Sequence, residues 1–164
     1  MGNFFVGEHY HKVDKKGRVS IPQTFRQVIQ DGDPERGPDG PFRFYLNYGQ
    51  HLRNQLRIYT YEAFFREVER IENLTDTDDR KLLRDVFIGQ SRDLEVDKDG
   101  RTLLPKAQRD KLGIEEGELY FKGAGLFFEI WIKEVYEATR RKKIEVRLSM
   151  FDEDDDIMDL LDKR

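Results

Sequence analysis

The segment VDKKGRVSIPQTFR at residues 13–26 is repeated 83 residues later as VDKDGRTLLPKAQR at residues 96–109. Seven residues are identical at this one offset: Val13/Val96, Asp14/Asp97, Lys15/Lys98, Gly17/Gly100, Arg18/Arg101, Pro22/Pro105 and Arg26/Arg109. Each copy lies in a half of roughly 80 residues, which is marginal for an independent core. Two intertwined copies that close one barrel would bury both apolar faces and remove the exposed sheet edges. The repeat therefore predicts a pseudo-twofold barrel within one chain.

Each copy has the pattern of a hairpin followed by a helix. Short strands flank the turns DKKG and DKDG, in which glycine suits a positive φ and aspartate can accept bonds from nearby amides. Because the proline after each hairpin suits the first turn of a helix, helices are predicted at 22–30 and 105–112, the second ended by Gly113. The turn residues expected to have a structural role are Asp14, Gly17, Asp97 and Gly100.

The remaining segments complete an α+β, mainly β fold with flanking helices. Short apolar runs predict further strands at 42–48, 56–61, 118–123 and 126–132. Helices are predicted at 62–74, 133–148 and 76–89, the last capped by Thr75 or Asp76. The Gly/Pro-rich segment 31–41 is interpreted as a loop inserted in the first half. The predicted organisation is a first half (4–74), a connecting helix (75–90), a second half (91–148) and an acidic tail (149–164).

Composition limits the class of protein. Hydrophobic residues make up 37% of the 164 residues, enough for a modest core. The absence of cysteine excludes a disulfide framework and a thiolate zinc site, and it fits a reducing compartment. No apolar run resembles a signal peptide or a membrane span, so we expect a soluble intracellular protein with no membrane partner.

Charge is distributed unevenly along the chain. The formal net charge is −4, but residues 152–162 hold seven acids and no base, so the rest of the chain carries +3. Residues 10–26 contain five bases against Asp14 alone, a net charge of +4, whereas the matching window 93–109 has four bases and four acids. A basic first hairpin and an acidic tail favour a polyanionic partner more than the total charge does.

The two charged turns are the candidate functional site. Duplicated about a pseudo-dyad, they would present two cationic knobs on one face, a geometry suited to phosphates and to the edges of a DNA groove. The alternative is that Asp14–Arg18 and Asp97–Arg101 are only ion pairs that stabilise the turns. We assign the carboxylates that structural role and Arg18 a DNA contact. The predicted DNA-binding residues are Lys15, Lys16, Arg18, Arg26, Lys98, Arg101 and Arg109.

Residues 4–145 resemble the MraZ family of bacterial transcriptional regulators. The resemblance is carried by HKVDKKGRVSIPQTFR, RIYTYEAFFREVERI, RKLLRDVFIG and the long segment from DLEVDKDGR to KEVYEA. It implies a swapped-hairpin, AbrB-like barrel, ring-shaped homo-oligomers, and binding to G-rich direct repeats in the promoter of the division and cell-wall gene cluster, which includes the regulator's own gene. It also implies association with the nucleoid. The family's DNA contacts fall here on Lys15, Lys16, Arg18, Lys98 and Arg101.

Three segments depart from the family pattern. Many members begin with Phe-Arg-Gly, where this chain has Phe5-Val6-Gly7. The loop at 31–41 is longer than in many members, and the acidic tail has no evident counterpart. We expect differences in partners or assembly at these segments.

Enzymatic functions find little support in the sequence. The carboxylates lie in turns and in the tail, and the sequence has no P-loop, no Gly-x-Ser-x-Gly motif and no cysteine nucleophile. His9, His11 and His51 have no metal-binding spacing with acids, so no metal, cofactor or small-molecule substrate is expected. The predicted function is a non-enzymatic, sequence-specific regulator that binds double-stranded DNA. The alternative is an oligomeric protein-interaction scaffold with no specific DNA target.

Overall fold

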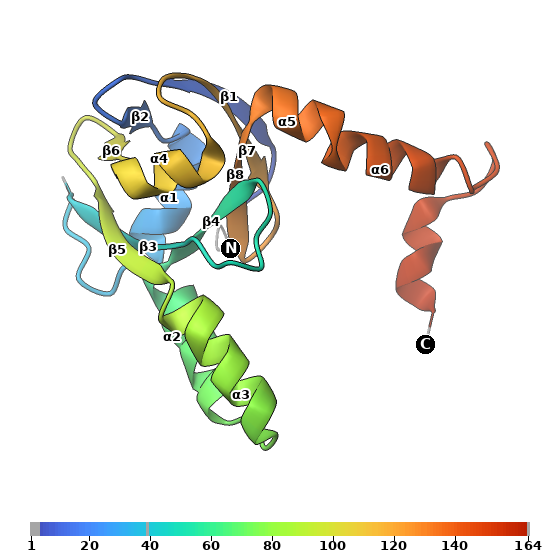
Figure 1. Cartoon of the computed structure of the whole chain (residues 1–164), viewed down its shortest axis with the longest axis horizontal. Helices are drawn as coiled ribbons and strands as arrows, with labels where there is room; N and C mark the ends of the chain where they lie inside the picture. The colour runs from blue at the N-terminus through green and yellow to red at the C-terminus, as the bar shows by residue number, and fades with distance from the viewer. Residues whose placement is uncertain (1–3, 39, 164) are drawn as a thin grey trace. The chain divides into compact units, whose positions relative to one another are not determined.

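Within residues 4–38 and 40–163, which the computed structural model describes, eight strands form one antiparallel sheet that rolls into a nearly closed barrel (Figure 1). The strands are β1 (Glu8–Val13), β2 (Arg18–Ser20), β3 (Phe42–Asn47), β4 (Gln55–Thr60), β5 (Ser91–Val96), β6 (Arg101–Leu103), β7 (Gly117–Gly123) and β8 (Phe127–Ile132). The chain divides into two compact units, Met1–Lys133 with the barrel and Glu134–Arg164. Asp39 of the predicted loop and Arg164 of the predicted tail lie outside the described residues.

The sheet interleaves the two copies of the repeat. Its strand order is β5-β3-β4-β8-β7-β1-β2-β6. Each strand before residue 75 therefore pairs with one after residue 90: β1 with β7, β2 with β6, β3 with β5 and β4 with β8. The pairs Val19↔Thr102 and Arg57↔Glu129 lie at the centres of the β2–β6 and β4–β8 ladders, and each joins residues that correspond between the copies. The predicted pseudo-twofold barrel built from two tandem copies is confirmed.

The second hairpin joins the two edge strands of the sheet. Strands β5 and β6 lie at opposite ends of the sheet order, but they are consecutive in the chain and are joined by the turn at 97–100. The amide of Asp97 donates to the carbonyl of Arg101 at 2.8 Å, and the amide of Gly100 donates to the carbonyl of Asp97 at 3.0 Å. This turn joins the two edge strands at one end, so the sheet comes closest to closing there.

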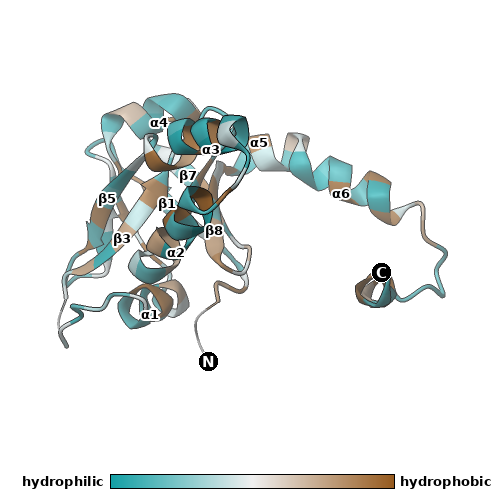
Figure 2. Ribbon diagram, turned by 90° about the horizontal axis from the view of Figure 1, so that it is seen from below, coloured by the Kyte–Doolittle hydropathy of each residue, from teal (hydrophilic) through white to brown (hydrophobic). Residues whose placement is uncertain are grey.

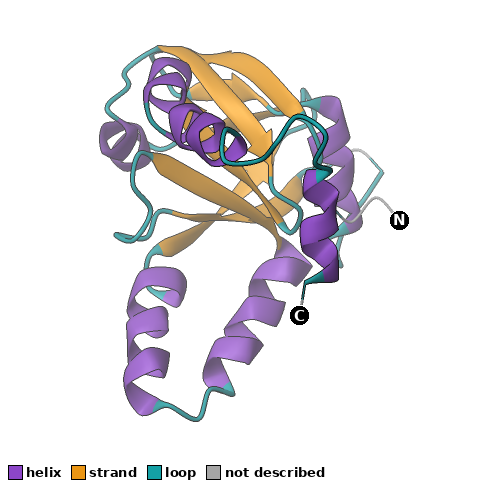
Figure 3. Cartoon of the chain, turned by 90° about the vertical axis from the view of Figure 1, so that its right-hand side faces the viewer, coloured by secondary structure: helices purple, strands orange, loops and turns teal. Residues whose placement is uncertain are grey.

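Helices follow both hairpins, as the prolines predict. Helix α1 (Gln23–Asp31) begins after Pro22, and α4 (Lys106–Leu112) begins after Pro105 and ends at Gly113 with a φ of +82°. Helix α2 (Tyr61–Glu72) and α3 (Thr77–Leu83) form a hairpin beside the sheet (Figure 3). Arg84, the residue after α3, makes a bidentate ion pair with Glu72 at the end of α2, at 2.7 and 2.6 Å.

Two of the predicted helices differ from a continuous α-helix. The one predicted at 76–89 begins after the cap Asp76 but becomes a π-helix at η1 (Arg84–Ile88), where the amide of Gly89 donates to the carbonyl of Arg84, five residues earlier. The helix predicted at 133–148 is broken at Thr139 into α5 (Lys133–Ala138) and α6 (Arg140–Leu148). The Thr139 hydroxyl donates to the carbonyl of Val135 at 2.6 Å, which also accepts from the Thr139 amide at 3.1 Å, and back-bonding of this kind often bends helices.

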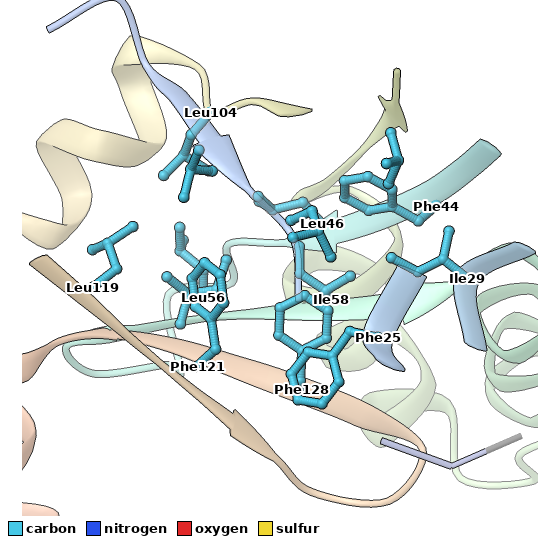
Figure 4. Close-up of a cluster of buried hydrophobic side chains, with 14 of the residues drawn as sticks. Phe25, Ile29, Phe44, Leu46, Leu56, Ile58, Leu104, Leu119, Phe121 and Phe128 are labelled. Atoms are coloured by element: carbon cyan, nitrogen blue, oxygen red, sulfur yellow. The ribbon is translucent and has the colours of Figure 1, made fainter. Parts of the chain in front are cut away.

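The barrel core is apolar and continuous across the two copies. Phe25 of α1 is fully buried and packs against Phe128 of β8 with ring centroids 4.7 Å apart and against Phe5 at 5.3 Å. Figure 4 shows side chains from α1, the sheet and the segment after β6 meeting in this cluster. Leu104 is the residue that follows β6, and it is also buried. The helix after the first hairpin and the strands of the second copy therefore share one core.

The loop at 31–41 is anchored by a buried carboxylate. Asp33 is 1% exposed and accepts bonds from the amide, Nε and NH2 of Arg43, the closest at 2.7 Å. Burial by itself would raise the pKa of Asp33, but the bonds from Arg43 and from the Glu35 amide lower it below its usual value. The loop is therefore fixed to the start of β3, which its Gly/Pro composition does not predict.

The smaller unit contains α6 and a 3-10 helix, η2 (Ile157–Asp162). Asp156 caps η2, its side chain accepting from the amide of Met158 at 3.0 Å. Apolar side chains of α6 and η2, among them Ile144, Leu148 and Leu160, line a shared pocket. Apart from these side chains, α6 is largely hydrophilic (Figure 2). None of the helices in the part of the chain that the structure describes is long and apolar enough to cross a membrane.

Candidate nucleic-acid interface

The first turn is held by Asp14. Its Oδ1 accepts from the amides of Lys16 and Arg18, each at 2.9 Å, and its Oδ2 accepts from Arg18 Nε at 2.7 Å. The bond from the Arg18 amide contributes most to lowering the pKa of Asp14. Partial desolvation raises this pKa, but the Arg18 side chain and the Lys16 amide lower it further, so the net shift is downward. The ion pair that the sequence offered as an alternative to DNA contact is thus present. It also fixes the direction of the Arg18 side chain, which remains about half exposed (49%).

The second turn has the same backbone bonds but a different ion pair. Asp97 Oδ1 accepts from the amides of Asp99 and Arg101, at 2.9 and 3.0 Å. The ion pair of Arg101 is made instead with Asp99, NH2 to Oδ2 at 3.6 Å. Asp99 stands where the first copy has Lys16. This single difference between the copies leaves the second tip with one cation fewer and gives Arg101 a carboxylate partner at the tip.

Strands β2 and β6 bring the two motifs onto one face. Arg18 pairs with Leu103 and Ser20 pairs with Arg101, so these four side chains share the outer face of the ribbon, and Val19 and Thr102 point inward and are buried. We call this surface the hairpin face: Arg18, Ser20, Arg101 and Leu103, with the exposed turn lysines Lys15, Lys16 and Lys98.

A groove on the hairpin face is lined by residues of both copies. Arg18 and Ser20 line it from the first copy, and Arg101 and Glu116 line it from the second. The sequence did not single out Ser20 or Leu103. The signal that could have found them is the alternation of exposed and buried residues in two short strands on either side of a pseudo-axis.

Arg26 and Arg109 lie behind the turns, each against the turn of the other copy. Arg109 donates from Nε to the carbonyl of Leu104 at 3.0 Å and from NH1 to the carbonyl of Lys15 at 3.2 Å. Arg26 packs against Gly100 in the corresponding position. The geometry gives both arginines a supporting role for the opposite turn, and their predicted DNA contacts stay predictions.

The two turn glycines are required by this cross-packing. Gly17 and Gly100 have φ values of +91° and +78°. A Cβ on Gly17 would collide with the Leu104 carbonyl oxygen, and one on Gly100 would collide with the Arg26 guanidinium. Both positions therefore favour glycine for its conformation, and at Gly17 the close approach of a backbone oxygen requires it as well.

The turn lysines differ in their surroundings. Lys15 Nζ lies 3.7 Å from Glu116, and both side chains are more than half exposed, so this contact contributes little to stability. Lys16 and Lys98 are exposed at the tips. No group of three His, Cys, Asp or Glu side chains among residues 4–38 and 40–163 is arranged to hold a metal ion. The interface therefore offers cations and an exposed ribbon, which suit a nucleic-acid backbone and groove.

Comparison with known proteins places this arrangement in a family. The family model described as "MraZ protein, putative antitoxin-like" matches residues 4–85. A protein named "Transcriptional regulator MraZ" from Ruegeria sp. is 38% identical over 163 residues, which cover 99% of this chain and 97% of that protein. A protein of the same name from Ruegeria pomeroyi is 40% identical over 163 residues, with the same coverage. Another, from Acetivibrio thermocellus, is 35% identical over 136 residues, which cover 82% of this chain and 85% of that protein. These matches, together with the two Asp-x-x-x-Arg hairpins, show that the chain belongs to the MraZ family.

Proposed function

We propose that this chain is a transcriptional regulator that binds double-stranded DNA through the hairpin face, in the cytoplasm and in association with the nucleoid. The observation that carries the proposal is the placement of Arg18 and Arg101 on one exposed ribbon about the pseudo-axis. The names of the relatives, which describe transcriptional regulators, support it.

The chemistry of the hairpin face suits a G-rich site. Arginine is the side chain most often found bidentate to O6 and N7 of guanine in the major groove. Because Arg18 uses Nε for Asp14, its two terminal nitrogens can serve such a contact. Lys15 and Lys16 at the tip would contact phosphates and set the register. We propose G-rich direct repeats in the promoter of the chain's own gene and of the division and cell-wall gene cluster as the target.

A footprint on the DNA upstream of the chain's own gene tests this target. DNase I protection is expected over G-rich repeats at regular intervals, and it should persist when heparin is added as a polyanionic competitor. A protein-interaction scaffold would give no protected repeats, and heparin would remove whatever DNA it holds.

The assembly proposed is a closed ring of identical subunits. Several large apolar side chains of the barrel unit are exposed, including Phe4 (58%), Val6 (74%) and Leu126 (41%). Phe4 and Leu126 line one surface pocket, and a monomer gains nothing from such a patch. Head-to-tail contacts between unlike surfaces form a ring when the rotation from one subunit to the next closes. Light scattering at micromolar concentration should give a multiple of 19.6 kDa, whereas a mass of 19.6 kDa would contradict the ring.

Lys16 is expected to act through a phosphate. For Lys16→Ala, the slope of log K against log salt concentration should become shallower by about 1, as for one lost phosphate contact, and the loss should be similar for specific and random duplexes. The matched variant is Asp99→Lys, which gives the second tip the charge of the first and should steepen the slope. An unchanged slope for Lys16→Ala would remove this lysine from the interface.

The acidic tail is proposed to compete with DNA for basic surfaces. Residues 152–162 carry seven acids, and five of them precede η2. Truncation after Phe151 should therefore raise affinity for random duplex more than for the specific site, since non-specific binding is almost entirely electrostatic. Filter binding with both duplexes measures this difference. If truncation leaves non-specific affinity unchanged, the competition does not occur.

A further inference from the structure

A second pocket lies next to the hairpin face. Its lining comes from four elements: His9 and His11 of β1, Ser20 of β2, Thr24 and Arg26 of α1, and Asp99 of the second turn. Ser20 also lines the groove on the hairpin face, so the two surfaces adjoin. The DNA contacts proposed above use neither histidine.

Arg26 is less satisfied here than its counterpart in the other copy. Arg109 donates Nε to the carbonyl of Leu104. Arg26 Nε is buried and has no hydrogen-bond partner among the described residues. A buried guanidinium donor without a partner is unusual, and Arg26 lacks the backbone bond that orients Arg109. The pseudo-twofold symmetry is therefore broken at the arginine that lines this pocket.

The histidines also occur on one side only. The residues that correspond to His9 and His11 in the second copy are Arg92 and Leu94. Both imidazoles are held by aromatic neighbours: the ring of His9 meets Phe25 edge-on at 4.9 Å, and that of His11 stacks on Phe121 at 5.8 Å. Two fixed imidazoles beside a guanidinium form a preorganised site for an anion.

The charged groups around the histidines come from two other elements. Arg26 faces them from α1 and Asp99 from the second turn, whereas their partners on β7, Leu119 and Phe121, are apolar. Burial lowers the pKa of His11 most, and the neighbouring His9 and Arg26 lower it further. Near neutral pH the His11 ring of the free protein is therefore uncharged, and an anion in the pocket would favour its protonated form.

We propose that His9, His11 and Arg26 form a phosphate-binding pocket that holds one backbone phosphate of the bound duplex, and that DNA binding takes up a proton there. This proposal rests on the DNA-binding function proposed above. Because an imidazolium binds phosphate better than a neutral ring does, affinity rises as the pH falls through the range in which His11 titrates. The pocket would extend the footprint from the hairpin face toward α1, on one side of the pseudo-axis only.

The test is DNA affinity at pH 8.0 and pH 6.0 at constant ionic strength. The unmodified chain should bind about three- to tenfold more tightly at pH 6.0 than at pH 8.0, and in His9→Gln/His11→Gln the ratio of the two affinities should fall close to 1. His51→Gln is the matched control, since desolvation also lowers the pKa of His51, which lies between β3 and β4, and this variant should keep the gain. An equal pH dependence in the double variant, or none in the unmodified chain, overturns the proposal.

Histidine ring NMR spectra with inorganic phosphate separate the pocket from the proposed function. Shifts of His9 and His11 on addition of phosphate, but not of chloride at equal ionic strength, support the site independently of any duplex. If these shifts occur but no duplex binds at either pH, the proposed DNA function is wrong. The ligand of the pocket would then be free phosphate and not a phosphate of DNA. If DNA binds and the rings do not respond to phosphate or to duplex, the pocket fails and the DNA function stands.

Discussion

Arg18→Ala is expected to weaken binding to a G-rich duplex by about 1–3 kcal/mol, and Arg101→Ala by clearly less. Arg18 is oriented by Asp14 through Nε at 2.7 Å and lies in a window with a net charge of +4. Arg101 lies in a window with no net charge, and one of its terminal nitrogens is 3.6 Å from Asp99. The first hairpin should therefore make the dominant contact.

Binding isotherms at two salt concentrations measure this difference. Each variant is first checked by thermal unfolding, because Arg18 also takes part in the ion pair of its turn. The matched variant is Asp99→Lys, which should bring Arg101 closer to the environment of Arg18 and increase the loss caused by Arg101→Ala. Equal losses from the two arginines would contradict the asymmetry, and no loss from either would leave both as ion pairs of their turns.

Gly17→Ala is expected to lower the free energy of unfolding by on the order of 3 kcal/mol. The residue has a φ of +91°, and its new Cβ would collide with the Leu104 carbonyl oxygen and lie 3.0 Å from Arg109 Nε. The same contact region holds the hydrogen bond from the Leu104 amide to the Gly17 carbonyl, at 2.7 Å, and the bond from Arg109 to Leu104. The substitution would therefore separate the first turn from the second copy.

Gly113→Ala is the matched control for that substitution. Gly113 has a similar φ of +82°, but a Cβ there would meet nothing within 4 Å. Its cost should be only that of the backbone conformation, about 1 kcal/mol. Chemical denaturation of both variants gives the comparison. Equal losses would show that cross-packing adds nothing to the conformational cost at Gly17.

The repeat predicted much of the fold because its elements are local. The turns, the prolines and Gly113 determine hairpins and helices from neighbouring residues alone, and the structure has them where these residues lie. The interleaved pairing followed from the need to bury two marginal halves together. The break at Thr139 and the π-helix before Gly89 could not be predicted, since both segments have a good helical pattern and depart from it only in local backbone geometry.

The site was less predictable than the fold. The spacing of Asp14 and Arg18 indicated an ion pair, but the contact of Arg101 with Asp99 depends on side-chain direction that the sequence does not contain. The packing of Arg26 and Arg109 against the opposite turns is a long-range contact between copies, so it required the register of the barrel. The pocket around the histidines combines residues from both copies for the same reason.

Fluorescence anisotropy on two duplexes tests the DNA-reading role of the hairpin face most directly. One duplex carries the G-rich direct repeats, the other has the same base composition in scrambled order, and both are titrated near 0.15 M salt with the unmodified chain and with Arg18→Ala. A sequence-specific regulator should prefer the repeats by at least about 10³-fold, and Arg18→Ala should lose a large part of that preference. Equal affinities of the unmodified chain for the two duplexes would contradict sequence-specific recognition by the hairpin face.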